Sequence, residues 1–256
     1  MTIIQDFAGR SALVTGAASG IGAACARALA ARGAARLYLV DVDGAGLDAL
    51  DLSEHSGCAV QRITGSVADE ALWQSLEPQM SGLDHAVVNA GIGSGGAIAE
   101  ISLAEWRRVM AVNLDGAFLT LAASLRAMAG KGGSAVVVAS VTGIKPVAGI
   151  GPYGVSKAAV AHMARIAAME SARKGIRVNA IAPGGVDTAI WESGEDFAAS
   201  VAAIGREATI KAMAKTTPLG RFATSEEMAD SILYLLSDAA SNITGHVMVS
   251  DGGFTL

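Results

Sequence analysis

The stretch Thr15-Gly-Ala-Ala-Ser-Gly-Ile-Gly22 decides the fold of this 256-residue chain. It follows Ser11–Thr15, a short apolar run that predicts a buried strand, and it leads into Ile21–Arg32, which predicts a helix closed by Gly33. Glycines at such a junction let the backbone approach a pyrophosphate, whose charge then faces the helix N-terminus. The alternative is an ordinary glycine-rich turn, which the position at the first strand–helix junction disfavours.

Strands and helices alternate along the rest of the chain. Continuous apolar runs predict strands buried on both faces, as in a parallel sheet covered by helices. These runs are Arg36–Asp41, Ala59–Thr64, His85–Asn89, Ala135–Ser140, Arg177–Ala182 and Val247–Ser250. A helix is expected around Ala45–Glu54, and Ser102–Glu105 and Thr224–Glu227 each predict a capping box. The pattern predicts an α/β fold, a Rossmann-type doubly wound parallel sheet with helices on both faces, and residues 1–256 forming one domain.

Composition excludes several classes of protein. Hydrophobic residues make up 52% and charged residues 17%, which predicts a large core and no disorder. A net charge of −5 disfavours nucleic acid as a partner. Cys25 and Cys58 are too isolated for a disulfide framework, and the four scattered histidines predict no metal site. We find no run of about 18 uncharged apolar residues and no signal peptide, so no membrane partner and a cytoplasmic location are expected.

A second glycine pattern is a decoy. Gly91, Gly93 and Gly96 match Gly-x-Gly-x-x-Gly literally, but a loop follows them, and the next predicted helix begins only after Ser102. That motif binds phosphates only where a strand turns directly into a helix. Asn89-Ala90-Gly91 is therefore interpreted as the turn that ends the fourth strand, close to the cofactor.

Asp41 predicts which cofactor is used. It ends the second strand, 25 residues after Gly16. A carboxylate there accepts hydrogen bonds from the adenosine ribose and repels the 2′-phosphate of NADP, by roughly 4 kcal/mol for charges about 4 Å apart at an effective dielectric near 20. No basic residue lies in the glycine loop or in Val42–Asp43. NAD is predicted, with NADP less favoured; a solvated strand-end acid is the alternative.

Tyr153 and Lys157 are the candidate catalytic pair. They lie one helical turn apart, so their side chains share a face, and a nearby ammonium would lower the tyrosine pKa toward its working range. Ser140, at a strand's carboxyl end, is placed to orient a substrate oxygen. Asn113 is a polar residue in an otherwise apolar helix. Taken singly, each has an ordinary alternative: a chance pair, a turn serine or a helix kink.

The segment Tyr153–Arg173 is apolar or small nearly all round, apart from Lys157, His162, Arg165 and Glu170. A helix of this composition has no fully solvated face, so either neighbouring elements or another subunit must cover it. A subunit interface is the prediction.

In order and spacing, these residues resemble the short-chain dehydrogenase/reductase family. The resemblance rests on Thr15–Gly22, Asn89–Gly91, Asn113, Ser140, Tyr153-x-x-x-Lys157 and Pro183-Gly184, and it extends to the closing Asp251–Gly253. It implies a sheet of seven strands, a catalytic tetrad and, as in many members, a homotetramer.

The resemblance also implies roles for individual residues. Tyr153 would be the acid/base, and Lys157 would lower its pKa and hold the nicotinamide ribose. Ser140 would position the substrate oxygen, and Asn113 would support a water-linked proton relay to Lys157. The implied cofactor contacts are Gly16, Ser19, Gly20, Ile21, Gly22, Asp41, Ser66, Val67, Asn89, Ala90, Gly91, Tyr153, Lys157, Pro183, Gly184, Val186 and Thr188.

Three positions depart from the family pattern. Ser66 stands where an aspartate near the adenine is usual, Val88 replaces the first asparagine of Asn-Asn-Ala-Gly, and Ser250 precedes Asp251 where valine is frequent. None belongs to the tetrad, so they bear on affinity rather than on chemistry.

The expected function is interconversion of a secondary alcohol and a ketone by hydride transfer with NAD. Two alternatives are an epimerase or lyase that retains bound NAD and a nucleotide-binding regulator without turnover. Residues 189–216 lack a predicted strand and are expected to form a lid over the substrate. The substrate is left open among secondary alcohols, polyols or cyclic dihydrodiols, hydroxysteroids and 3-oxoacyl thioesters, and so is the direction of the reaction.

Overall fold

A seven-stranded parallel sheet forms the centre of the computed structural model, which describes residues 5–55, 57–193 and 195–256. The strand order is β3-β2-β1-β4-β5-β6-β7, so the order along the sheet reverses between β1 and β4. The strands are β1 (Ser11–Thr15), β2 (Arg36–Asp41), β3 (Ala59–Thr64), β4 (His85–Val88), β5 (Gly133–Val138), β6 (Ile176–Pro183) and β7 (Val247–Ser250). The predicted doubly wound α/β sheet is confirmed.

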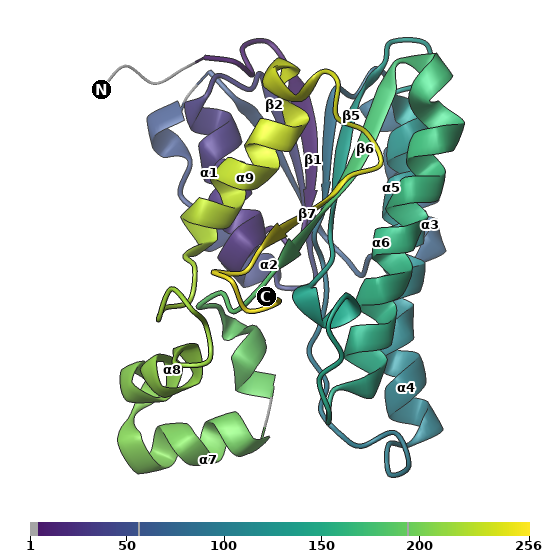
Figure 1. The fold of residues 1–256 in the computed structure, drawn as a ribbon. Helices are drawn as coiled ribbons and strands as arrows, with labels where there is room; N and C mark the ends of the chain where they lie inside the picture. Colours follow the sequence, from purple (N-terminus) through teal and green to yellow (C-terminus); the bar gives the residue numbers. More distant parts are fainter. Residues whose placement is uncertain (1–4, 56, 194) are drawn as a thin grey trace.

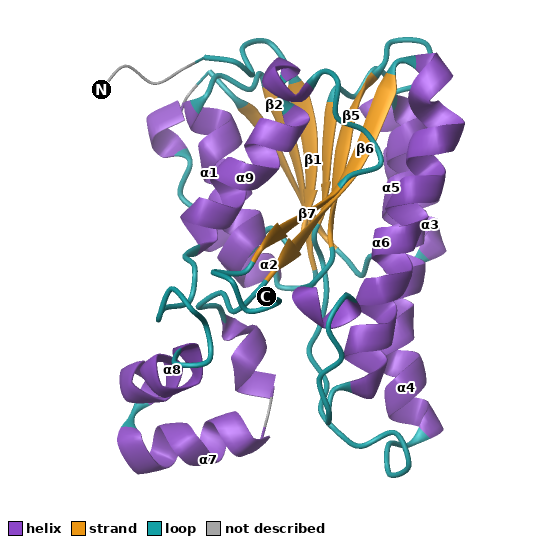
Figure 2. Cartoon of the chain, viewed as in Figure 1, coloured by secondary structure: helices purple, strands orange, loops and turns teal. Residues whose placement is uncertain are grey.

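Helices cover both faces of the sheet (Figure 1). They are α1 (Gly20–Ala31), α2 (Gly44–Ala49), α3 (Glu70–Leu76), α4 (Leu103–Met110), α5 (Ala117–Ala127), α6 (Gly151–Ser171), α7 (Glu195–Ile204), α8 (Arg206–Ala214) and α9 (Ser225–Leu236). Helices α1 and α9 pack together on one face, and α3, α5 and α6 lie on the other. Figure 2 shows the strand arrowheads directed toward the end of the sheet where α7 and α8 lie.

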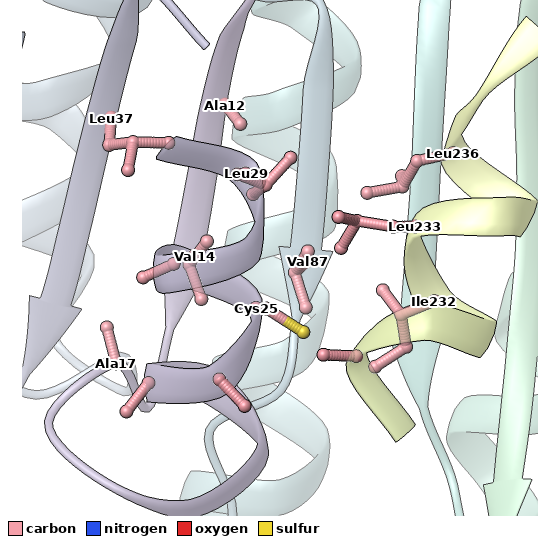
Figure 3. Packing of buried hydrophobic residues seen from close by; sticks show 14 of the residues in the cluster. Ala12, Val14, Ala17, Cys25, Leu29, Leu37, Val87, Ile232, Leu233 and Leu236 are labelled. Atoms are coloured by element: carbon pink, nitrogen blue, oxygen red, sulfur yellow. The ribbon is translucent and has the colours of Figure 1, made fainter. Parts of the chain in front are cut away.

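Two apolar clusters hold these layers together, one on each face. Along β1, Ala12 and Val14 join the cluster under α1 and α9, whereas Leu13 joins the cluster under α5 and α6. Successive side chains of a strand point to opposite faces, so a continuous apolar run is needed to fill both layers. Figure 3 shows the first cluster, where Leu29 of α1 and Leu233 of α9 meet over the sheet. Cys25 lies in this cluster as a buried free thiol.

Several predicted boundaries differ from the structure. Strand β4 ends at Val88 and β5 ends at Val138, so Asn89 and Ser140 lie beyond their strands. Their polar groups are engaged locally instead: Asn89 bonds the glycine loop, and Ser140 caps the short 3₁₀ turn Val141–Gly143. The predicted helix around Ala45–Glu54 is shorter, because α2 ends at Ala49 and only a 3₁₀ turn, Ser53–His55, follows.

Of the two predicted capping boxes, only one is complete. At α9, the Thr224 hydroxyl accepts from the Glu227 N–H, and the Glu227 carboxylate accepts from the Thr224 N–H. At α4, Ser102 caps the Glu105 N–H, but the Glu105 carboxylate binds Ser94 and Arg108. The prediction for Ser102 was wrong in this half, because Arg108 takes both oxygens of the Glu105 carboxylate and Ser94 shares one of them.

Helices α4 and α5 are continuous through a π-helical segment, Ala111–Gly116. By length and composition alone this 25-residue helix, Leu103–Ala127, is apolar enough to cross a membrane, because one 18-residue window within it has a mean hydropathy of 1.2. However, 44% of the apolar window is buried inside the fold. The buried hydroxyls of Thr120 and Ser124 bond carbonyl oxygens of the same helix, and α5 packs on β4.

Candidate active site

The carboxyl ends of six parallel strands bring the candidate residues to one edge of the sheet. Because parallel strands all end at the same edge, residues far apart in sequence meet there, and the reversal between β1 and β4 opens a crevice for a ligand. The residues placed there by successive strands are Gly16, Asp41, Ser66, Asn89, Ser140 and Gly184.

The glycine loop is too tight for side chains. A Cβ on Gly22 would lie 2.0 Å from the Gly16 carbonyl oxygen, and Gly16 itself has a positive φ of 66°. Ser19 makes no side-chain cap to α1, and the first turn of α1 holds no acidic residue. The N–H groups at the start of this 12-residue helix therefore face the crevice beside a backbone that a bulky phosphate can approach. This cradle fits the pyrophosphate of a dinucleotide.

The turn after β4 holds the glycine loop in place. The N–H groups of Asn89 and Ala90 donate to the Thr15 hydroxyl, and Asn89 Nδ2 donates to the Thr15 carbonyl at 2.9 Å. No helix begins at Gly91 or the glycines after it, so this pattern lacks the strand–turn–helix context of a phosphate-binding loop. A Cβ on Gly91 would lie 3.3 Å from Lys157 Nζ, so this turn lies between the glycine loop and α6.

Asp41 binds the glycine loop directly. Its Oδ2 accepts from the Ala18 N–H at 2.9 Å, and its Oδ1 accepts from the Asp43 N–H at 3.0 Å. Each carboxylate oxygen keeps a further acceptor site, and the carboxylate is partly exposed. The Arg62 guanidinium, on the neighbouring strand β3, donates to the carbonyls of Leu47 and Leu50, so it is already engaged within the protein.

Other predicted cofactor contacts line the same edge. After β3, the Ser66 hydroxyl accepts from the Ala68 N–H, and Val67 is buried against Gly116. After β6, the loop crosses back over the glycine loop, because a Cβ on Gly20 would lie 3.2 Å from the Thr188 methyl group. Pro183 ends β6, Gly184 packs on Asp251, and Val186 is buried.

Tyr153 and Ser140 meet across the catalytic end of α6. The Ser140 hydroxyl lies close enough to the Tyr153 phenol to affect its pKa. The Ser140 hydroxyl oxygen also accepts from Thr142 Oγ1 at 3.0 Å and from the Thr142 N–H at 3.2 Å, which leaves its own hydrogen for the tyrosine. Burial raises the pKa of the Tyr153 phenol, and the Ser140 hydroxyl acts in the opposite direction.

Lys157 is buried one turn along α6. Its ammonium donates to the Val138 carbonyl at 2.8 Å and lies 5.7 Å from the centre of the Tyr153 ring. Burial lowers the pKa of Lys157 to about 8. Desolvation is the largest cause of both shifts, so the Tyr153 pKa is raised here, and its lowering by Lys157 stays a prediction.

Asn113 connects these elements through its side chain. It lies in the π-helical segment, where Oδ1 accepts from the Ile92 N–H at 2.8 Å and Nδ2 donates to the Ile92 carbonyl at 3.0 Å. Nδ2 also donates to the Ser156 hydroxyl, which in turn donates to the Tyr153 carbonyl at 2.7 Å. Both ends of the side-chain amide are thus engaged in hydrogen bonds to the turn after β4 and to α6. A water-linked proton relay to Lys157 would therefore have to use the backbone groups of Asn113.

The role of Ser156 and the contacts that hold the predicted lid, residues 189–216, were not expected from the sequence. Ser156 is fully buried, and its position beside Lys157, one turn after Tyr153, was the available signal. In the lid, Trp191 stacks on Phe222 with ring centres 5.4 Å apart, and its Nε1 donates to the Val186 carbonyl. Arg206 of α8 pairs with Asp187 at 2.7 Å. Gly194, within the predicted lid, lies outside the described residues.

Comparison with known proteins shows similarity along almost the whole chain. A family model described as Enoyl-(Acyl carrier protein) reductase matches residues 16–255. Cis-4-hydroxycyclohexanecarboxylate dehydrogenase of Sinomonas cyclohexanicum is 40% identical over 258 residues, which cover 98% of each chain. 2,5-dichloro-2,5-cyclohexadiene-1,4-diol dehydrogenase of Sphingobium indicum is 35% identical over 267 residues, 98% of this chain and 99% of that protein.

A solved structure matches the fold equally well. The crystal structure of a short-chain type dehydrogenase/reductase from Mycobacterium marinum has a TM-score of 0.85 at 34% identity and covers 98% of both chains. The similarity therefore includes the glycine loop, the catalytic helix α6 and the closing tail after β7.

Proposed function

Since this chain belongs to the short-chain dehydrogenase/reductase family and is an oxidoreductase acting on CH–OH groups, we propose that it transfers hydride between a ring-borne secondary alcohol and NAD. The observation that carries this proposal is the meeting of Ser140 and Tyr153 at the crevice, with Lys157 buried beside them. The ring-borne alcohol is proposed because both relatives named above are dehydrogenases of ring alcohols.

In the proposed mechanism, the substrate oxygen lies between the hydroxyls of Ser140 and Tyr153. During oxidation the Tyr153 phenolate takes the hydroxyl proton while the same carbon loses hydride, and the ketone forms. The glycine loop would hold NAD, and the nicotinamide would accept the hydride. Ser140 donates a hydrogen bond that stabilises the phenolate and orients the substrate, and Lys157 adds positive charge. In reduction, the Tyr153 phenol returns the proton.

Absorbance of NADH tests this function. Purified protein, NAD and a panel of secondary alcohols, beginning with cis-4-hydroxycyclohexanecarboxylate and including polyols and hydroxysteroids, should give NADH with at least one ring alcohol. Turnover of open-chain polyols alone would contradict the ring-borne substrate. Tightly bound NAD that turns over substrate without release of NADH would contradict a net dehydrogenase.

NAD is proposed over NADP because of the carboxylate at the end of β2. Asp41→Asn keeps an acceptor for the Ala18 N–H and removes the charge, so repulsion of a 2′-phosphate falls. The kcat/KM for NADP divided by the kcat/KM for NAD should rise by at least about tenfold. This is less than the full repulsion between the carboxylate and the 2′-phosphate would give, because solvent and salt screen the two charges. The matched control is Asp48→Asn, which removes an exposed carboxylate on α2. An unchanged ratio in Asp41→Asn, or an equal rise in the control, would refute the assignment.

A homotetramer is proposed from the apolar side chains left exposed on α5 and α6. Phe118 is 56% exposed, and Ile166 and Met169 are 45% and 84% exposed. Exposed apolar side chains of this size are favoured at subunit contacts. Light scattering should give about four times the chain mass of 25.7 kDa, and Met169→Glu should lower that mass. A monomer at micromolar concentration would contradict this proposal.

Residues 189–216 are proposed as the substrate lid. The lid is supported by its position beyond the carboxyl edge (Figure 2) and by its anchors to the loop after β6. Fluorescence of Trp191, which stacks on Phe222, should change when substrate binds to the protein with NADH.

The cytoplasm is proposed as the location of the protein. Fractionation of the source cells checks this location, and recovery in the membrane pellet would oppose it.

A further inference from the structure

Lys145 is a cation without an acidic partner at the catalytic edge of the sheet. It lies on the loop beyond Ser140, and its N–H donates to the Val141 carbonyl at 2.8 Å. Its ammonium donates to the Phe254 carbonyl at 2.8 Å and lies 4.8 Å above the Phe254 ring. No carboxylate of the described residues lies within 4.0 Å of it. An ammonium has three donors, so two remain for another acceptor.

The tail that carries Phe254, the residue that Lys145 contacts, is itself held in place. Asp251, directly after β7, accepts from the N–H groups of Gly253 and Thr255, both at 2.8 Å, and from the Thr255 hydroxyl at 2.7 Å. The Gly252 carbonyl accepts from the Leu219 N–H, just beyond the lid. The C-terminus therefore lies at the carboxyl edge, near the loop after β5 (Figure 1). Lys145 is consequently a positioned charge rather than a free surface side chain.

Exposed apolar side chains lie on the loop that carries Lys145 and at the start of α6. Ile144 and Val147, on the same loop, are 50% and 41% exposed. Ile98 is 72% exposed and lies against Gly151, at the start of the helix that carries Tyr153. The rim of the site thus combines an apolar surface with one positioned ammonium, a combination that suits a ligand with an apolar body and an anionic end.

We propose that Lys145 binds a carboxylate carried by the substrate at the end remote from the reacting hydroxyl. This inference rests on the proposed function, and it narrows the substrate class to hydroxy acids with an apolar ring. A chain with a net charge of −5 repels an anion as a whole, so a local cation with two open donors is needed to select one. The ammonium–carboxylate hydrogen bonds are charge-assisted and contribute to binding rather than to the hydride step.

Calorimetry on the protein saturated with NADH tests this inference without turnover. Cyclohexanecarboxylate and cyclohexanecarboxamide have nearly the same shape and differ in charge. Lys145→Met should weaken binding of the carboxylate by about tenfold or more and leave the carboxamide unchanged, and Lys145→Arg should retain most of the affinity. Lys174→Met removes an exposed lysine just before β6, at the opposite edge of the sheet, and should change neither.

The carboxamide separates loss of charge from a shift of the tail. Equal affinity of the wild-type protein for the two compounds, or equal weakening of both in Lys145→Met, would overturn the role of Lys145. Failure of the proposed function is distinguishable: the carboxylate would still bind through Lys145, while cis-4-hydroxycyclohexanecarboxylate and the rest of the alcohol panel would yield no NADH.

Discussion

Tyr153→Phe should lower kcat by about 10²- to 10⁴-fold, the range that a positioned general acid/base contributes. The substitution keeps the ring that packs near Lys157 and removes only the hydroxyl, which lies close to Ser140. The variant then has no group in contact with the substrate oxygen whose pKa would let it take up or give back the proton. NADH absorbance with saturating substrate measures kcat, and NADH fluorescence checks that the cofactor still binds.

Tyr234→Phe is the matched control, because Tyr234 lies partly exposed on α9 and should keep full activity. A Tyr153→Phe protein that binds NADH and retains more than about a tenth of the wild-type kcat would exclude Tyr153 as the acid/base, since even weak acid/base catalysis exceeds that factor. Ser140, whose hydroxyl is bonded to Thr142 and lies close to Tyr153, would then be the next residue to test.

Lys157→Met should change how stability depends on pH. The folded-state pKa of Lys157 is about 8, below its ordinary value of 10.5, so between these values the folded chain holds fewer protons than the unfolded chain. Below pH 8 the buried ammonium destabilises the folded state, and this destabilisation is lost as pH rises toward 10.5. Relative to the variant, the wild-type free energy of unfolding should therefore increase by about 2–3 kcal/mol from pH 7 to pH 10.

Urea unfolding at both pH values measures this difference. The variant has no titrating group at this position, so the titration of the rest of the chain is common to both proteins and cancels in the comparison. Lys174→Met, at an exposed lysine, should show no such dependence. A pH-independent gap between wild type and Lys157→Met would contradict the buried ammonium. In the activity assay Lys157→Met should also have a lower kcat than the wild-type protein. Lys157 would then be a residue that costs stability at neutral pH and serves catalysis.

Local pattern was sufficient for the fold and for most of the candidate site. The glycine loop, the apolar runs and the Tyr153–Lys157 spacing are short-range features, and parallel strands necessarily bring their carboxyl ends together. The wrong predictions also have local causes. The Glu105 carboxylate accepts from Arg108 instead of completing a capping box, and β5 ends before Ser140, whose side chain caps the following turn. Ser156 was missed because its position beside Lys157 is a weak signal, and only the structure shows its bond to Asn113.

Spacing along the chain thus settled the order of strands and helices, the position of the cofactor loop and the pairing of Tyr153 with Lys157. Only the tertiary structure decided the contacts between distant segments, such as Lys145 with Phe254 and Trp191 with Phe222. It also decided the direction of the pKa shifts, raised for Tyr153 and lowered for Lys157. The reason is physical: helix and strand periodicity act over a few residues, whereas desolvation depends on every element packed around a group.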